Sequence, residues 1–469
     1  MTLSEQLVEF AAGLSGSKLR PDVTRDLRQR ILDIIGLTLI GRSHDFGQAA
    51  ERAAANLGGT GDATVIGSMR RLTPAHAALA NATAAHGLDF DDTHLRAITH
   101  VSSSVVPTAL AMAERCSASG SEVLAAVAAG SEVKVRLGTA LSAALIARGF
   151  HPSAVIGPFA CAITAGKLAG LDSPQMVNAL GIVGSQAAGI LEYLGDGSSV
   201  KRMHPGWAAL SGISAVELAL AGIDGPREVF EGRYGFARTH LQGLDPDLSN
   251  VTADLGETWH LLDTSFKPYP SCHLNHTFIS SSLDIRAAHS PDPGDIESID
   301  CEIAEGEVPL VCEPMAAKRR PRSEYEAKFS LYYNVAAALV DGRVDVATFS
   351  PEAITRPEAL ALADRVTYRL DPASSYPDTW WGKVTVRMRD GRTHYAETLE
   401  PKGSRSNPMD PSDLRAKFDR NVELSGLGLD ADLIAREVDA LAERPDVSAL
   451  MAACRTRADQ DSRWLEAER

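Results

Sequence analysis

The sequence has few cysteines and no motif that would join them in a metal site or a redox pair. Its 469 residues include six cysteines, at positions 116, 161, 272, 301, 312 and 454, and no two of them form a CxxC pair. A zinc knuckle and a thioredoxin-like dithiol both need such closely spaced cysteines. Scattered single cysteines are most often buried small hydrophobic residues. We therefore expect no cysteine-based metal or redox chemistry.

Long apolar runs are also missing. A membrane-spanning helix needs roughly 18 apolar residues in a row. The nearest stretch, Ser153 to Gly166, contains Pro158 and is followed by Lys167. The opening residues, MTLSEQLVEF, are acidic where a secretory signal is basic. We therefore expect a soluble, cytoplasmic protein.

Positive charge is scarce relative to negative charge. The 46 Lys and Arg residues stand against 61 Asp and Glu residues, a net charge of −15. This surplus repels a phosphate backbone and an anionic membrane leaflet, so we expect neither nucleic acid nor a membrane as a partner. A hydrophobic share of 44% and a charged share of 23% are ordinary for a globular protein and exclude a wholly disordered chain.

The first half of the chain is rich in Ala, Leu and Gly and has the pattern of one helix after another. Residues 22–39, for example, place Leu27, Ile31 and Ile35 at helical spacing. Many interior positions of the later segments are Ala or Gly. Because these side chains are small, we expect the helices to approach one another closely in a compact helical block.

The pattern changes near Leu262, where period-two stretches begin. Strands are predicted at 298–303, 365–370, 383–388 and 393–399. Asp390-Gly391 between the last two predicts a hairpin turn. One helix, Glu324–Val340, is predicted among these strands, and helices return after Asp410.

These segments predict a mostly α protein with an inserted α+β domain. We expect a large all-helical domain at residues 1–264 and a smaller α+β lid domain at 265–405. Helices at 406–469 then complete the large domain.

One window concentrates reactive side chains: HGLDFDDTH at 86–94, followed by Thr99-His100. It holds three carboxylates, three imidazoles and two hydroxyls within fifteen residues. Such a set suits proton transfer, a metal site, or a solvated loop whose Asp and Thr side chains cap helices. No HExxH, EF-hand or full DDxxD spacing is present, and we expect no bound metal.

Three further segments place cations and imidazoles before predicted helices or at the predicted domain junction. They contain His151 in GFHPS, Lys201, Arg202 and His204 in VKRMHPG, and Lys267 and His273 in KPYPSCH. Helix N-termini attract anions, and Lys, Arg and His together match a small polycarboxylate. Cys272 is not expected to act as a nucleophile with His273, because neighbours in an extended chain point to opposite sides.

Taken in order, these segments resemble the MmgE/PrpD family over nearly the whole chain. The resemblance rests on HGLDFDDTH, GFHPSAVIG, SVKRMHPGWAA, GPREVFEGRYGF and KPYPSCH. The family includes 2-methylcitrate dehydratase, cis-aconitate decarboxylase and iminodisuccinate epimerase. The resemblance implies a helical large domain with an α+β lid, a site in the cleft between them, a homodimer, and no metal or organic cofactor.

Together with the chemistry of the segments, the resemblance assigns residue roles. The implied catalytic residues are Asp89, His100, His151, His273 and Tyr333, and the implied substrate-binding residues are Thr93, Lys201, Arg202, His204 and Lys267. We expect His151 and His273 to transfer protons, with His100 as a third candidate. Asp89 is expected to orient an imidazole or Thr93, because a bare carboxylate would repel an anionic substrate.

The resulting hypothesis is a cofactor-independent lyase that dehydrates a citrate-like substrate such as 2-methylcitrate. The alternatives are decarboxylation of cis-aconitate and epimerisation of an imino- or amino-dicarboxylate such as iminodisuccinate. Two other classes stay open: a non-catalytic polycarboxylate-binding protein, and a metal-dependent hydrolase that uses Asp89, Asp91, Asp92 and His94. The sequence does not choose between substrates, because pocket shape distinguishes a methyl, hydroxyl or amino group.

Overall fold

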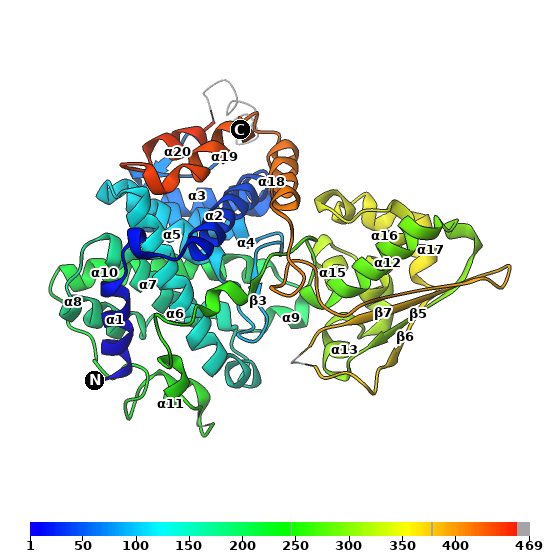
Figure 1. Ribbon diagram of the computed structural model, residues 1–469, viewed down its shortest axis with the longest axis horizontal. Helices are drawn as coiled ribbons and strands as arrows, with labels where there is room; N and C mark the ends of the chain where they lie inside the picture. The colour runs from blue at the N-terminus through cyan, green and yellow to red at the C-terminus, as the bar shows by residue number, and fades with distance from the viewer. Residues whose placement is uncertain (245, 377–378, 457–469) are drawn as a thin grey trace. The chain divides into compact units, whose positions relative to one another are not determined.

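The chain forms two compact units, one largely helical and one that contains a sheet. The computed structural model describes residues 1–244, 246–376 and 379–456. Of the described residues, the first unit comprises Met1–Gly87, Asp91–Thr264 and the chain from Asp410 to Thr456, and the second comprises Leu88–Phe90 and Ser265–Met409. Figure 1 shows helices throughout the first and both helices and strands in the second. The predicted fold class, mostly α with an α+β part, is confirmed.

The first unit is built almost entirely of helices. They are α1 (Leu3–Gly13), α2 (Pro21–Arg42), α3 (Asp45–Gly58), α4 (Pro74–His86), α5 (Ser102–Cys116), α6 (Gly120–Ala147), α7 (Pro152–Leu168), α8 (Ser173–Val183), α9 (Tyr193–Asp196), α10 (His204–Leu220), α11 (Phe236–Leu241), α18 (Pro411–Ser425), α19 (Ala431–Asp439) and α20 (Ser448–Ala453). Short strands β1 (Thr60–Thr64), β2 (Arg71–Leu72) and β3 (Thr93–His94) lie between them, and β4 (Thr264–Ser265) marks the end of this part of the chain. Across the described part of the chain, every helix is too short or too polar to cross a membrane.

Helices α7 and α10 pack along each other through small residues. A Cβ added to Gly212 of α10 would lie 2.5 Å from the Cβ of Cys161 in α7, and one added to Gly157 of α7 would lie 2.9 Å from the Cβ of Ala208 in α10. The expected close approach of Ala- and Gly-rich helices is confirmed here. Residue numbers rise together along the contact, so the two helices are parallel and their N-termini lie side by side.

The second unit contains a four-stranded sheet in the order β6-β5-β7-β8. Its strands are β5 (Ile296–Ile303), β6 (Val366–Leu370), β7 (Gly382–Met388) and β8 (Thr393–Thr398), and its helices are α12 (His276–His289), α13 (Val308–Val311), α14 (Met315–Arg319), α15 (Glu324–Lys328), α16 (Leu331–Asp341) and α17 (Pro357–Ala363). Strands β5 and β6 are parallel, and the other neighbours are antiparallel. The predicted hairpin is confirmed: Gly391, at φ +88°, lies in the turn between β7 and β8.

The single helix predicted over Glu324–Val340 is wrong, because the structure divides it into α15 and α16. The side chain of Ser330 accepts a hydrogen bond from the backbone N–H of Tyr333 at 3.0 Å and thereby caps α16. The amide of Asn334 donates to the carbonyls of Ala327 and Ser330 at the break. Serine and asparagine side chains compete with helical backbone hydrogen bonds in this way.

The loop between α4 and α5 is tied to α2 by the buried carboxylate of Asp92. One oxygen accepts the backbone N–H groups of Ser102, at 2.9 Å, and Val101, at 3.3 Å, at the start of α5. The other oxygen accepts the Ser102 hydroxyl at 2.5 Å and Arg30 Nη1 at 2.7 Å. Arg30 also donates to Asp26 and to the carbonyl of Thr264. One ion pair thus joins α2, the loop and the N-terminus of α5, where a negative charge is favoured.

Replacing Arg30 should destabilise the protein much more than replacing the exposed arginine that precedes the same helix. Arg30→Met leaves Asp92 buried without its cation, and we expect a loss of about 3–5 kcal/mol in the free energy of unfolding. The control is Arg20→Met, because Arg20 pairs with Asp22 on the surface; there we expect a loss below about 1 kcal/mol. Urea denaturation followed by circular dichroism measures both. Equal losses in the two variants would contradict the anchoring role.

Candidate active site

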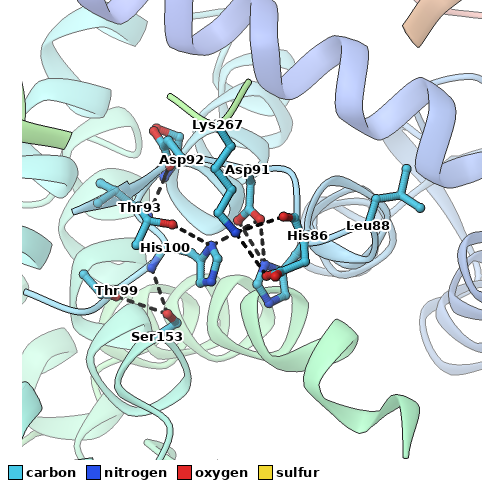
Figure 2. A network of polar contacts seen from close by, with 12 residues as sticks. His86, Leu88, Asp91, Asp92, Thr93, Thr99, His100, Ser153 and Lys267 are labelled. Atoms are coloured by element: carbon cyan, nitrogen blue, oxygen red, sulfur yellow. Dashed lines mark hydrogen bonds and ion pairs between the residues drawn. The ribbon is translucent and has the colours of Figure 1, made fainter. Parts of the chain in front are cut away.

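The carboxylate of Asp91 holds two imidazoles. His86, the last residue of α4, places Nδ1 3.0 and 2.9 Å from the two oxygens of Asp91, and His100 Nδ1 lies 3.2 Å from Oδ1. Figure 2 shows the three side chains directed toward one another. Because a carboxylate only accepts hydrogen bonds, each ring donates to Asp91 from Nδ1, and in a neutral imidazole this places the lone pair on Nε2. Asp91 therefore orients both rings, with Nδ1 of each directed toward its carboxylate.

Burial and the hydrogen bonds together set the charges in this group. Burial alone would raise the pKa of the Asp91 carboxyl, but the adjacent His100 and His86 hold that pKa well below its usual range. Burial lowers the pKa of His86 to about 4 in spite of the neighbouring carboxylate. The result is an ionised Asp91 beside a neutral His86 imidazole at neutral pH.

The loop that carries His100 is fixed on the N-terminus of α7. The hydroxyl of Ser153 accepts the backbone N–H of His100 at 2.9 Å and lies 3.2 Å from the Thr99 hydroxyl, as Figure 2 shows. The Thr93 hydroxyl lies 3.5 Å from His100 Nδ1. The structure therefore brings together Thr93 and His100, two of the predicted site residues.

His151 and His204 form a second imidazole group. His151 precedes α7 as its N-cap and His204 is the first residue of α10, so the parallel packing of these helices places the two rings together. Their Nδ1 atoms are 2.8 Å apart. The ring of Tyr193 meets both imidazoles edge to face, with 5.9 Å between centroids in each pair. The His151 ring also lies 6.4 Å from that of His86, so the two groups adjoin.

Both of these imidazoles are neutral at physiological pH. Burial, followed by the positive charge of Lys201, lowers the pKa of His151 well below its usual value and that of His204 to about 4. The N-termini of α7 and α10 add a partial positive charge that also opposes protonation. The site therefore combines one fixed cation with imidazoles that can each donate or accept a proton.

Lys201 and Arg202 occupy different surroundings although they are adjacent in sequence. Lys201 is buried in a short 3₁₀ turn, Ser199–Met203, that leads into α10. The guanidinium carbon of Arg202 lies 4.4 Å from the centroid of the Phe46 ring on α3. This cation–π contact gives Arg202 a packing role. That Arg202 also binds a substrate carboxylate stays a prediction.

Asp89 and Lys267 pair with each other inside the second unit. Lys267 Nζ lies 3.4 Å from the Asp89 carboxylate and donates to the carbonyls of Asp89, at 2.9 Å, and Ser271, at 3.1 Å. The sequence predicts that Asp89 orients an imidazole or Thr93; the carboxylate that contacts the imidazoles of His86 and His100 is Asp91. Since Asp89 offsets the charge of Lys267, the predicted binding of a substrate carboxylate by this lysine stays a prediction.

His273 and Tyr333 also lie in the second unit and are both buried. The His273 ring packs against those of His276, 4.5 Å away between centroids, and Trp380, 5.7 Å away. The Tyr333 hydroxyl donates to the carbonyl of Thr348 at 2.7 Å, and its ring belongs to the hydrophobic core. These contacts give Tyr333 a packing role, and its predicted catalytic role stays a prediction.

The residues considered from the sequence as metal ligands have other hydrogen-bond or ion-pair partners. Asp92 binds Arg30 and Ser102, Asp89 pairs with Lys267 in the other unit, and His94 Nδ1 accepts the N–H of Ala97 at 3.0 Å. Among the residues that the structure describes, ligand atoms do converge in His86, Asp91 and His100, all within 4.8 Å of one another. In this arrangement the Nδ1 atoms of both imidazoles face the Asp91 carboxylate.

Sequence reasoning assigned no role to His86, and it assigned Asp91 only that of a metal ligand in the alternative hydrolase. Both lie in the window that concentrates reactive side chains, but their spacing of five residues matches no established motif. The available signal was position, because His86 ends a predicted helix and the carboxylates follow in a loop. Three carboxylates within four residues gave no basis for choosing Asp91 over Asp89 and Asp92.

The buried neutral imidazoles should make the protein sensitive to acid. The folded-state pKa values of His86, His94 and His204 are each lowered by burial to about 4, against about 6.5 in an unfolded chain. The unfolded chain therefore binds more protons in this window. We expect the free energy of unfolding to fall from about pH 6.5 to about pH 4, by about 1.4 kcal/mol per pH unit for each imidazole. Asp33, whose pKa burial raises to about 6, opposes this trend in part.

Urea titrations between about pH 7 and pH 5 measure this dependence. The control variant is His94→Asn, whose amide oxygen can accept the Ala97 N–H without titrating. Its slope should be smaller than that of the parent protein by about 1.4 kcal/mol per pH unit. An unchanged slope would contradict the burial of a neutral His94.

Comparisons with known proteins agree with the resemblance that the motifs predicted. The model of the MmgE/PrpD N-terminal domain matches residues 5–249, and that of the MmgE/PrpD C-terminal domain matches residues 269–428. The chain is 28% identical to cis-aconitate decarboxylase of Mus musculus over 90% of this chain and 87% of that protein. It is 29% identical to the enzyme of Homo sapiens over 90% and 88%, and 27% identical to that of Aspergillus terreus over 86% and 85%. The chain belongs to the MmgE/PrpD family.

Proposed function

We propose that the protein is a cofactor-independent lyase that decarboxylates a small polycarboxylate of the cis-aconitate type. The observation that carries the proposal is the group formed by His151, His204 and Lys201: two neutral imidazoles beside one buried cation. The relatives named cis-aconitate decarboxylase match along most of the chain, which supports this reaction over the dehydration expected from the sequence. Homodimer formation and a cytoplasmic location stay predictions.

Decarboxylation makes two demands on a site. The bond to the departing carboxylate breaks, its electron pair stays on the substrate, and a proton must then reach carbon. Lys201 and the N-termini of α7 and α10 can stabilise the negative charge that develops on the remaining carboxylates. A neutral imidazole with hydrogen on Nε2 can deliver the proton. Both demands are met by residues of the first unit.

The local charge also suits this class of substrate. The chain has a net charge of −15, so a polycarboxylate is repelled by most of its surface. Lys201 and two helix N-termini provide a positive region among buried groups, where an ionic contact is stronger than in water.

Dehydration of a citrate-like substrate, such as 2-methylcitrate, is the second candidate. Elimination of water needs a base for a C–H proton and an acid for the departing hydroxyl. The Nε2 lone pairs of His86 and His100 and the neighbouring His151–His204 pair supply both kinds of group. This candidate therefore uses the same residues with a different division of roles.

A mass-spectrometric substrate screen tests the proposal. The protein is incubated with cis-aconitate, citrate, 2-methylcitrate and iminodisuccinate, each with and without EDTA. We expect cis-aconitate to lose the mass of carbon dioxide at a rate that EDTA does not change. Loss of a water mass from a citrate would support dehydration, and altered optical rotation at constant mass would support epimerisation. EDTA-sensitive turnover, or binding without any turnover, would overturn the proposal.

Replacing a proposed proton-transfer residue should lower turnover far more than replacing a surface histidine. We expect His151→Ala and His100→Ala each to lower kcat by about 10²–10⁴-fold, the usual contribution of general acid–base groups. The control is His289→Ala at the end of α12, because His289 is exposed and stacks only on His394 among the aromatic rings described. Near-parental turnover in both His151→Ala and His100→Ala would contradict the assignment.

A further inference from the structure

His151 and His204 share one short hydrogen bond between identical atoms. Their Nδ1 atoms lie 2.8 Å apart, and the side chains belong to residues that are only 6% and 4% exposed. Two nitrogen lone pairs at this distance repel each other, and two N–H groups would clash. One ring therefore donates a hydrogen from Nδ1 and the other accepts it.

This bond places the two rings in complementary tautomers. In a neutral imidazole, one nitrogen carries the hydrogen and the other carries the lone pair. The ring that donates from Nδ1 has its lone pair on Nε2, whereas the ring that accepts at Nδ1 has its hydrogen on Nε2. The pair thus offers one basic Nε2 and one acidic Nε2–H at the same place.

The backbone around the pair keeps both rings in position. The N–H of His151 donates to the carbonyl of Gly189 at 3.0 Å. A Cβ added to Gly189 would lie 2.2 Å from the Cβ of Ala154 and 3.6 Å from Cε1 and Nε2 of His204. Glycine at φ +149° therefore lets the backbone at residue 189 approach Ala154 and the His204 ring while it binds the His151 N–H. Tyr193 covers the pair from another direction.

Other charged and titratable groups near the pair favour its neutral form. Lys201 lies close enough to oppose protonation of both rings, and His86 and His100 do so for His151. The two rings themselves stand at the N-termini of α7 and α10, whose dipoles act in the same sense. A single shared hydrogen is therefore the state expected at neutral pH.

We propose that His204 is a positioning residue that fixes the tautomer of His151, and thereby decides whether Nε2 of His151 presents an acid or a base. This replaces the expectation that His204 binds substrate. The statement about acid and base rests on the proposed function, whereas the tautomers themselves do not. A group that fixes the tautomer of a proton-transfer histidine affects turnover strongly, as a carboxylate does in the Ser-His-Asp triad.

The first test is nuclear magnetic resonance of the substrate-free protein with ¹⁵N-labelled histidine. Couplings between ring nitrogens and ring hydrogens report the tautomer of each imidazole, and the single variants His151→Phe and His204→Phe assign the signals. We expect one of the two residues with hydrogen on Nδ1 and the other with hydrogen on Nε2 at neutral pH. Both rings in the same tautomer, or either ring cationic, would overturn the proposal. This readout is independent of any substrate, so it stands even if the proposed reaction fails.

The second test compares two replacements of His204. His204→Asn places an amide near the former Nδ1 and can still bind His151, whereas His204→Phe keeps the ring that packs on Tyr193 but removes both nitrogens. We expect kcat to fall about 10–100-fold in His204→Phe with little change in KM, and to fall much less in His204→Asn. The His151 signal should become a mixture of tautomers only in His204→Phe. Equal losses in the two variants, or a raised KM with unchanged kcat, would indicate direct substrate binding and overturn the proposal.

Discussion

The geometry of the site depends on how a buried carboxylate, Asp92, is neutralised. Its oxygens bind Arg30 and the N-terminus of α5, so the loop after α4 is held from two directions. Asp91 precedes Asp92 in that loop. Its contacts with His86 and His100 therefore depend on the loop keeping this conformation. A buried ion pair stabilises a fold weakly overall, but removing one partner is costly. The pair therefore acts mainly by specifying one conformation of the loop.

The helical unit buries several ionisable groups. The cost of burying each group is offset by different partners. Asp92 has a guanidinium and helix N–H groups, Asp91 has two imidazole N–H groups, and His151 and His204 remain neutral and share one hydrogen. Lys201 is the fixed cation beside them. This arrangement explains how a chain with a net charge of −15 can contain a positive region suited to an anion. It also explains why the imidazoles stay uncharged, and thus able to donate or accept a proton.

Local patterns predicted the elements of the fold well. Helical spacing at 22–39 corresponds to α2, and Asp390-Gly391 corresponds to the turn between β7 and β8. The prediction was wrong where a side chain overrides the pattern: Ser330 caps a new helix inside an apolar periodic stretch, and periodicity cannot detect that hydrogen bond.

The sequence by itself determined the fold class, the family and the segments that hold the reactive side chains. Each of these follows from local spacing or from motifs in order along the chain. Only the tertiary structure decided which side chains act together. Asp91 rather than Asp89 holds the imidazoles, and His151 meets His204 across 53 residues. The physical reason is that hydrogen bonds reach about 3 Å, and only the parallel packing of α7 on α10 and the anchoring of Asp92 bring these atoms within that distance.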